Sequence, residues 1–315
     1  MQRGITCLDP IRVGHWTNYK AQTGCTAIIC PGAVAGVDVR GAAPGTRETD
    51  LLRGYNLVEC VHAIMLSGGS AYGLDAASGA MQYLEENRIG LDVGVGVVPI
   101  VPSAVLFDLG VGDASVRPGR LEGYAACEAA TDSAKLRGRV GAGAGATIGK
   151  AFGMQHAMLG GFGSSFVELS LGVCLAALVV VNAFGDVYEH RTGRFIAGAQ
   201  INGRITPCID KLSELPSAAA FNNTTLGIIA TNAVLTREQA NKLAAQAHNG
   251  FALSIRPVHT CMDGDTIFSI STSKVKTDSL LQLYSAAAEV MAFAVEDAAR
   301  AANKLTEAGL TNPHI

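Results

Sequence analysis

The stretch Thr224-Thr225-Leu226-Gly227-Ile228-Ile229-Ala230 is a run of seven residues without a charge. A continuous apolar run of this kind is typical of a strand that is buried on both faces. Residues 203–223, GRITPCIDKLSELPSAAAFNN, precede it with two prolines, few large apolar side chains and mixed charge. This composition predicts a surface connector. The hydroxyl residue Thr224 therefore stands where a connector enters a fully buried strand.

Apolar segments extend from this strand in both directions along the chain. Further strands are predicted at 24–39 (two strands around a Pro-Gly turn), 93–109 (buried strands broken by proline), 166–189 (a hairpin) and 266–271, and residues 54–66 are a further apolar segment. Helices are predicted at 73–87, 121–136, from the capping box of Thr236 to about His248, and from about Thr277 to about Lys304. The strands come in consecutive pairs and do not alternate strictly with helices. This order favours a layered α+β sandwich over a doubly wound sheet.

The composition excludes several classes of protein. Of the 315 residues, 49% are apolar and 16% are charged, against roughly 25% charged in an average domain. This excludes a disordered chain. The net charge is −3 and no long basic run is present, so the chain does not fit a nucleic-acid binder. The 37 glycines and the low charge predict closely packed layers in a single domain, 1–315, that assembles as a homo-oligomer.

The sequence also favours a cytoplasmic protein without contact to a membrane. Residues 1–7, MQRGITC, lack the apolar core of a signal peptide. The longest apolar run, Leu171–Val181, is too short to cross about 30 Å of hydrocarbon. The eight cysteines are scattered singly, which predicts free thiols in a reducing compartment.

Common cofactor and nucleophile motifs fail on specific residues. Residues 143–150, GAGATIGK, lack the first glycine and the hydroxyl residue of a phosphate-binding loop. Ser70 is followed by Tyr72 where a nucleophile elbow needs glycine. No HExxH pair occurs, and Asp263-Gly264-Asp265 alone offers only two carboxylates as metal ligands. We expect neither a metal nor an organic cofactor.

Several short segments occur along the chain in an order that is typical of one family. They are Ile11–His15, Gly45–Leu52, Ser67–Ala77, Gly149-Lys150, Val181–Gly185, Asn223-Thr224 and His259–Thr266. Together they resemble the DmpA-type L-aminopeptidase/D-esterase family, which includes β-peptidyl aminopeptidases and aminohexanoate-oligomer hydrolases. The resemblance covers essentially the whole chain. It implies a four-layer αββα sandwich of the DmpA/ornithine-acetyltransferase type, similar to N-terminal-nucleophile hydrolases.

The resemblance implies a precursor that cuts itself between Asn223 and Thr224, giving fragments 1–223 and 224–315. A threonine hydroxyl is a poor nucleophile and needs an adjacent base. A freed α-amine, with a pKa near 7.7–8.0, is partly neutral at pH 7 and can accept the hydroxyl proton. Before the cut the same nitrogen is an amide and cannot act as a base. Self-cleavage therefore creates the catalyst.

Further catalytic roles follow from the resemblance. Asp263 would orient the hydroxyl and amine of Thr224, and Asp265 would be the second carboxylate of that relay. Asn182 would donate its side-chain amide to the oxyanion, and Lys150 would place a positive charge near the nucleophile. The residue pattern alone leaves structural roles open. Lys150 would then be a solvated lysine, Asn182 a turn residue, and the two aspartates an Asp-Gly-Asp turn.

The substrate is expected to be a small peptide or amide, with Ser70, Phe107 and Asp108 in the binding site. The aminopeptidase branch of the family reads a free amine with a glutamate and a tyrosine, and residues 102–108, PSAVLFD, contain neither. An aminopeptidase is the first expectation, and an endo-type amidase on ω-amino-acid oligomers or other small amides stays open. A hypothesis of another class is an uncleaved, catalytically silent assembly protein. The family implies tetramers or larger oligomers.

Overall fold

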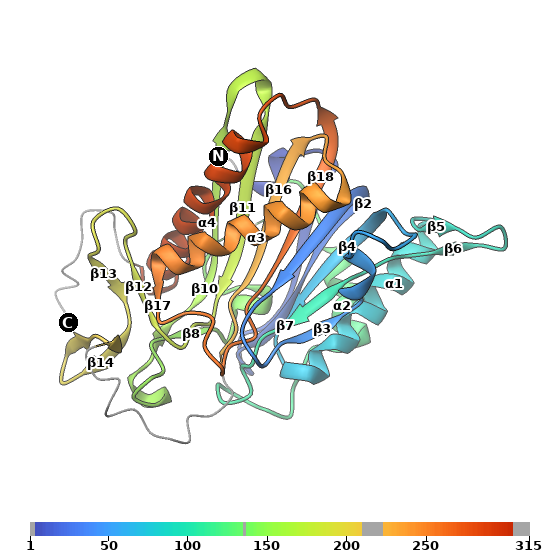
Figure 1. Cartoon of the computed structure of the whole chain (residues 1–315). Helices are drawn as coiled ribbons and strands as arrows, with labels where there is room; N and C mark the ends of the chain where they lie inside the picture. Colours follow the sequence, from blue (N-terminus) through green and yellow to red (C-terminus); the bar gives the residue numbers. More distant parts are fainter. Residues whose placement is uncertain (1–3, 135–136, 210–222, 305–315) are drawn as a thin grey trace.

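The computed structural model describes residues 4–134, 137–209 and 223–304, and a nine-stranded sheet forms its centre (Figure 1). In order across the sheet the strands are β10 (Gly161–Glu168), β11 (Cys174–Val181), β16 (Leu226–Ala233), β18 (Thr266–Val275), β2 (Thr23–Val39), β4 (Cys60–Ser67), β7 (Ser103–Val105) and β3 (Gly45–Arg47), with β1 (Arg12–Asn18) also paired to β2. Strand β16 is parallel to β18 and antiparallel to β11.

Smaller sheets and four helices complete the described part of the chain. The short strands are β5 (Leu91–Asp92) with β6 (Val97–Val98), β8 (Thr147–Ile148) with β9 (Met158–Leu159), β12 (Asp186–Tyr188) with β13 (Phe195–Ala197) and β17 (Ile255–Arg256), and β14 (Ala199–Ile201) with β15 (Arg204–Thr206). The α-helices are α1 (Ala76–Glu86), α2 (Arg120–Glu128), α3 (Arg237–Ser254) and α4 (Leu280–Asn303). As the sequence predicts, Thr236 and Gln239 form a capping box at the start of α3.

Strand β2 joins the two halves of the central sheet. On one edge its residues 23–29 pair with β1 and its residues 34–39 pair with β18, while the other edge pairs with β4. The prediction of two strands around a Pro-Gly turn is wrong here. Pro31 and Gly32 lie inside one strand, where the register against β4 shifts between Ile29 and Ala33. The irregularity is absorbed as a bulge, so the strand continues through the proline.

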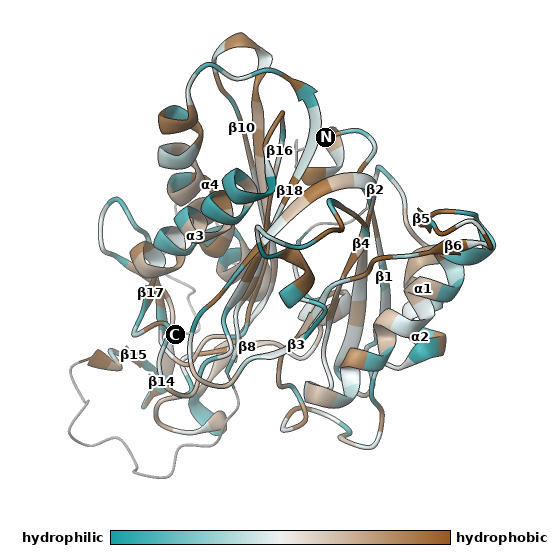
Figure 2. Ribbon diagram, turned by 45° about the vertical axis from the view of Figure 1, so that its right-hand side comes forward, coloured by the Kyte–Doolittle hydropathy of each residue, from teal (hydrophilic) through white to brown (hydrophobic). Residues whose placement is uncertain are grey.

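The core has three apolar layers between four layers of secondary structure. One cluster lies between the helices α3 and α4 and one face of β11 and β16, and a second lies between the two halves of the sheet. The third lies between α1 and α2 and the outer face of β2 and β4. Successive side chains of a strand point to opposite faces of the sheet, so one strand contributes to two clusters. In β11, Leu175, Ala177 and Val179 face the first cluster, while Ala176 and Leu178 face the second. Figure 2 shows much of the central strands in brown, and the predicted αββα sandwich is confirmed.

The apolar stretch 93–109 is buried only in its second part. Its first part belongs to a hairpin of β5 and β6 that projects from the body (Figure 1), and Val95 at its tip is 98% exposed. The continuation from Pro99 to Leu106 is buried. The prediction of buried strands is wrong for the hairpin, whose residues Leu91, Val95 and Val98 are exposed within the described part of the chain.

Several element boundaries also differ from the sequence prediction. Strand β4 starts at Cys60, helix α2 ends at Glu128, and the predicted hairpin 166–189 is formed by β10 and β11, with β12 in a separate sheet. In the predicted connector 203–223, residues 204–206 form β15, and residues 210–222 lie outside the described residues. The core pattern survives these shifts, because boundaries depend on local turns more than on the apolar period.

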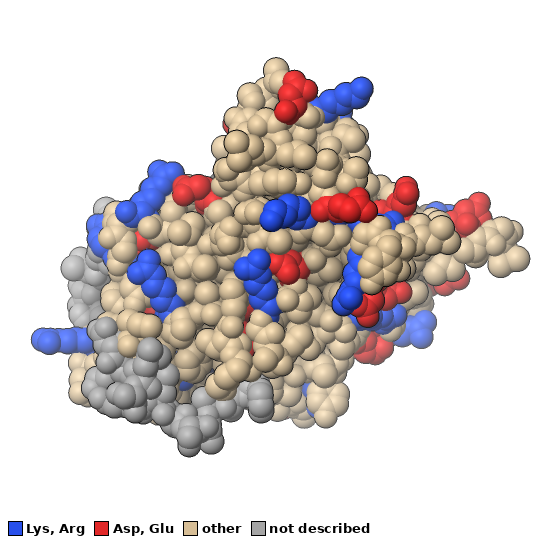
Figure 3. Space-filling model, in the orientation of Figure 1, with Lys and Arg blue, Asp and Glu red and all other residues tan. Residues whose placement is uncertain are grey.

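The surface carries few charges, as the composition requires. Figure 3 shows Lys and Arg interspersed with Asp and Glu over one face that is mostly uncharged. All eight cysteines are free thiols. None of the helices in the described part of the chain combines the length and apolar character that crossing a bilayer requires.

Candidate active site

The predicted catalytic residues meet at one edge of the central sheet because adjacent strands end there. Asn182 directly follows β11, Thr224 lies two residues before the start of β16, and Asp265 directly precedes β18. The registers align these ends, since Leu226 at the start of β16 lies opposite Val180 of β11 and Thr266 of β18. Residues far apart in sequence are thereby brought together by the strand order alone.

Asn182 is the centre of a buried hydrogen-bond network. Lys150 Nζ donates to both Asn182 oxygens, at 3.1 Å to the backbone O and 2.8 Å to Oδ1. The backbone N–H of Thr224 donates to the same Asn182 O at 3.0 Å. Thr147 N also donates to Oδ1, at 3.0 Å, which fixes the amide orientation, and Asn182 Nδ2 donates to Phe107 O at 3.1 Å. Asn182 therefore holds Lys150 and Thr224 next to each other.

The hydroxyl of Thr224 faces the peptide bond that precedes it. Thr224 Oγ1 donates to the carbonyl oxygen of Asn223, and Gly264 N–H donates to that oxygen at 3.3 Å. Asn223 and Thr224 are only 3% and 4% exposed. A Cβ atom at position 264 would lie 2.9 Å from Thr224 Oγ1 and 2.6 Å from Ala43 O, so only glycine fits there. The Gly264 N–H was not among the predicted site groups.

The two carboxylates are held by backbone N–H groups. Thr260 N–H donates to Asp263 Oδ2 at 2.7 Å, and Thr225 N–H donates to Asp265 Oδ1 at 2.7 Å. Asp265 Oδ2 accepts from His259, through the backbone N at 3.2 Å and ring Nδ1 at 2.8 Å. His259 was not among the predicted catalytic residues. The signal for it was its place six residues before Asp265 in the family-like segment 259–266.

Burial changes the protonation of the charged groups in this cluster. It lowers the pKa of Lys150 to about 7, against the opposing effect of Asp263 and Asp265. Burial, together with the charge of Asp265, raises the pKa of Asp263 to about 6. Both shifts favour the uncharged forms of these two side chains. Buried groups with such shifted pKa values are typical of catalytic sites.

A pocket of about 280 Å³ opens onto Thr224. It is lined by Ala43, Pro44, Gly45, Ser70, Ala71, Val105, Leu106, Phe107, Asn223, Thr224 and Met262. Two of the three predicted substrate-binding residues, Ser70 and Phe107, are part of this lining.

Asp108 is the predicted substrate-binding residue that does not line the pocket. Its Oδ2 accepts from Thr23 Oγ1 and its Oδ1 accepts from Gly69 N–H, both at 2.7 Å. Burial raises the pKa of Asp108. Its carboxyl group thus holds the turn at Gly69, next to Ser70, whose φ of +56° lies in the left-handed region. Asp108 supports one wall of the pocket from behind.

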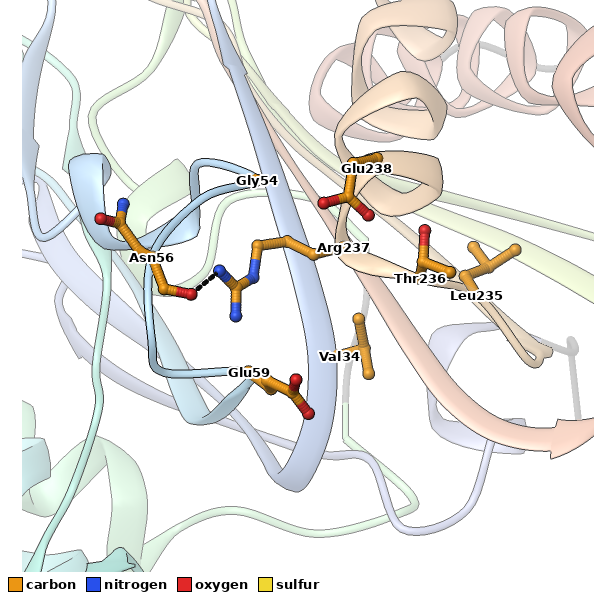
Figure 4. Close-up of a pocket in the computed structure, with 8 residues that line it drawn as sticks. All are labelled: Val34, Gly54, Asn56, Glu59, Leu235, Thr236, Arg237 and Glu238. Carbon is orange, nitrogen blue, oxygen red and sulfur yellow. Dashed lines mark hydrogen bonds between the residues drawn. The ribbon is translucent and has the colours of Figure 1, made fainter.

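A second pocket, of about 310 Å³, lies at the start of α3 (Figure 4). Figure 4 shows Arg237 reaching from the helix to the loop that contains Asn56. The guanidinium donates to the carbonyl oxygens of Asn56, Arg53 and Val58, and the Thr236 hydroxyl caps the helix. These groups hold the loop to the helix.

Within the described residues, no cluster of three or more His, Cys, Asp or Glu could bind a metal ion.

The chain is similar to known proteins over most of its length. The model of peptidase family S58 matches residues 4–311. An uncharacterized aminopeptidase of Mycobacterium tuberculosis is 43% identical over 289 residues, which cover 86% of this chain and 82% of that protein. A 6-aminohexanoate-oligomer endohydrolase of Kocuria sp. is 34% identical over 273 residues, which cover 84% of this chain and 74% of that protein.

A solved structure shows the same fold. The L-aminopeptidase D-Ala-esterase/amidase from Ochrobactrum anthropi superimposes with a TM-score of 0.74 at 18% identity, covering 95% of this chain and 86% of that one. The family match and the identity to the sequence relatives go beyond the fold. The chain therefore belongs to peptidase family S58, the DmpA family that its segments predict, and is a hydrolase of amide bonds.

Proposed function

We propose that the chain cleaves itself between Asn223 and Thr224 and then hydrolyses amides with Thr224 as its N-terminal nucleophile. The observation that carries the proposal is the contact between Thr224 Oγ1 and the Asn223 carbonyl group inside the buried catalytic cluster. A hydroxyl held against the carbonyl of its own preceding peptide bond is placed for an N-to-O acyl shift. Lys150 and Asp265 belong to the same cluster, because they contact Asn182 and the backbone of Thr225.

In the self-cleavage step Thr224 Oγ1 attacks the carbonyl carbon of Asn223, and its hydroxyl proton is passed on to the Thr224 nitrogen, which becomes the leaving group. The oxygen of Asn223 becomes an oxyanion, which the Gly264 N–H stabilises from its starting distance of 3.3 Å. The C–N bond then breaks, the nitrogen of Thr224 takes up the hydroxyl proton, and an ester joins Asn223 to Oγ1. Water hydrolyses this ester, which leaves a carboxylate on Asn223 and a free amine and hydroxyl on Thr224.

In the hydrolysis of substrate, the new amine of Thr224 accepts the proton of its own hydroxyl as Oγ1 attacks the amide carbonyl. Asn182 O, which accepts from the Thr224 nitrogen at 3.0 Å, orients that amine. Lys150 places its charge beside the amine and favours the neutral form. Asp263 and Asp265 hold the backbone around the nucleophile, and an N–H group of Asn182 Nδ2 stabilises the oxyanion. The amine of Thr224 gives the hydroxyl proton to the substrate nitrogen as the amide C–N bond breaks and the amine product leaves. Water then releases the acyl group from Oγ1.

For the substrate we propose aminopeptidase-type cleavage first, because relatives over 40% identical carry that name. The pocket favours a second candidate, an endo-type amidase. Among the described residues, those lining the pocket carry no charged side chain, and Asp108 is occupied by Thr23 and Gly69. A free ammonium group in this pocket would lack a side-chain carboxylate as its partner, whereas an uncharged acyl group would not need one.

Two assays test the proposal. Thr224→Ser, which keeps a hydroxyl, is expected to cleave itself and hydrolyse amides, whereas Thr224→Ala should stay at full length on a denaturing gel and be inactive. An active Thr224→Ala would refute the nucleophile. Amino-acid p-nitroanilides are then compared with their N-acetyl forms. Turnover of the free-amine substrates alone identifies an aminopeptidase, and turnover of the acetylated forms identifies the endo-type amidase. An uncleaved protein that turns over neither set would be the silent assembly protein.

A further inference from the structure

We propose that His259 is a positioning residue, which holds Asp265 and, through it, the backbone that carries Thr224. This inference rests on the proposed function, because it concerns the same nucleophile. His259 lies in the loop before β18 and is not among the residues that line the pocket. Its role is argued from its contacts with Asp265 and from the ring packing around it.

Asp265 connects His259 to the nucleophile segment through its two oxygens. Oδ1 accepts from Thr225 N–H at 2.7 Å, one residue after the nucleophile. Oδ2 accepts from the backbone N and from ring Nδ1 of His259, at 3.2 and 2.8 Å. Asp265 is 1% exposed, so its orientation depends on these donors. Fixing Oδ2 fixes the plane of the carboxylate and therefore the direction of Oδ1.

The contact with Asp265 determines the tautomer and orientation of the His259 ring. A carboxylate only accepts hydrogen bonds, so Nδ1 carries the proton in this contact. Within the described residues, the ring nitrogen Nε2 of His259 has no hydrogen-bond partner. The ring of His248 packs edge to face against the ring of His259, with the two ring centroids 4.8 Å apart. Burial lowers the pKa of His248 to about 3, so this neighbour stays neutral near pH 7.

The backbone at His259 adopts a conformation that serves the same contact. Its φ is +54°, in the left-handed region that side-chain-bearing residues seldom occupy. In this conformation the N–H and the ring of one residue both point at Asp265 Oδ2. A histidine held in this way for a single carboxylate is consistent with a positioning role.

The test compares His259→Gly with His259→Asn. Both residues tolerate a positive φ, but only asparagine keeps an N–H donor near the position of Nδ1. Because misplacement of a reacting group by about 1 Å can cost roughly 100-fold in rate, we expect kcat and self-cleavage in His259→Gly to fall by about that factor. KM should change less than about twofold, since the pocket lining is untouched. His259→Asn should stay within a few-fold of the wild type, and added imidazole should restore part of the activity of His259→Gly.

Two controls keep the test decisive. Arg88→Gly introduces glycine at another left-handed position, φ +55°, far from the cluster in sequence, and should leave kcat unchanged. If His259→Gly does not fold, His259→Asp replaces it, because aspartate has the shape of asparagine without the donor. Wild-type kcat in His259→Gly, or equal rates in the Asn and donor-free variants, would overturn the role of His259. An active Thr224→Ala would instead overturn the proposed function.

Discussion

Gly264→Ala is expected to block self-cleavage while the protein still folds. The added Cβ would lie 2.6 Å from Ala43 O and 2.9 Å from Thr224 Oγ1, and carbon contacts of this length do not persist in folded proteins. Relief of such overpacking costs about 1–3 kcal/mol of folding stability. It also displaces the Gly264 N–H, which is already 3.3 Å from Asn223 O. Loss of one oxyanion donor slows a reaction by roughly 10²–10³.

Cell-free synthesis provides a time zero for the assay, and a denaturing gel then follows the full-length band. We expect the half-time of cleavage in Gly264→Ala to increase by about two orders of magnitude, with a modest fall in melting temperature. Gly110→Ala is the matched control, because a Cβ there meets nothing within 4 Å and φ is not in the left-handed region. Cleavage of Gly264→Ala at the wild-type rate would refute the assignment of the Gly264 N–H to the oxyanion.

Three further predictions concern the cluster and the cleaved protein. The first uses Thr224→Ala, which stays uncleaved. Burial lowers the pKa of Lys150 to about 7 from its ordinary 10.5. Between these two pH values the unfolded chain binds more protons than the folded chain, so the free energy of unfolding rises with pH across that window. Between pH 7 and pH 10 the rise is about 3–4 kcal/mol. Urea unfolding at these two pH values should show this difference, and Lys150→Met should lose it; an identical pH dependence in both proteins would contradict the shift. Asn182→Ala should lower kcat by roughly 10²–10³ even in the cleaved fraction, as measured with a p-nitroanilide, and normal turnover would remove Asn182 from the oxyanion role. The two fragments should coelute in native gel filtration and separate only in denaturant, because β16 and β18 of the second fragment lie between β11 and β2 of the first; separation without denaturant would contradict this.

The layers of the fold can be predicted from the sequence because alternate residues of a strand face different layers, so their polarity shows which faces are buried. In β11 both sets of alternate residues are apolar, and the structure buries one set under α3 and α4 and the other between the sheet halves. The same rule fails at β5 and β6, because an apolar composition does not show whether another layer covers a hairpin. It also fails at Pro31-Gly32, where a turn dipeptide is absorbed by a bulge in β2.

The candidate site is predictable where residues stand at the ends of apolar strands. Asn182, Thr224 and Asp265 are of this kind, and the strand order brings them to one edge. Asp108 and His259 show what sequence position cannot give. The side chain of Asp108 turns toward Thr23 and away from the pocket, and His259 reaches Asp265 through a left-handed backbone conformation that no local pattern indicates.

N-terminal sequencing combined with intact mass spectrometry of a fully active sample shows whether Thr224 becomes the first residue of the active enzyme. We expect two polypeptides of 223 and 92 residues, the smaller beginning Thr-Thr-Leu-Gly. A single mass for the whole 315-residue chain in a sample with full activity would contradict it.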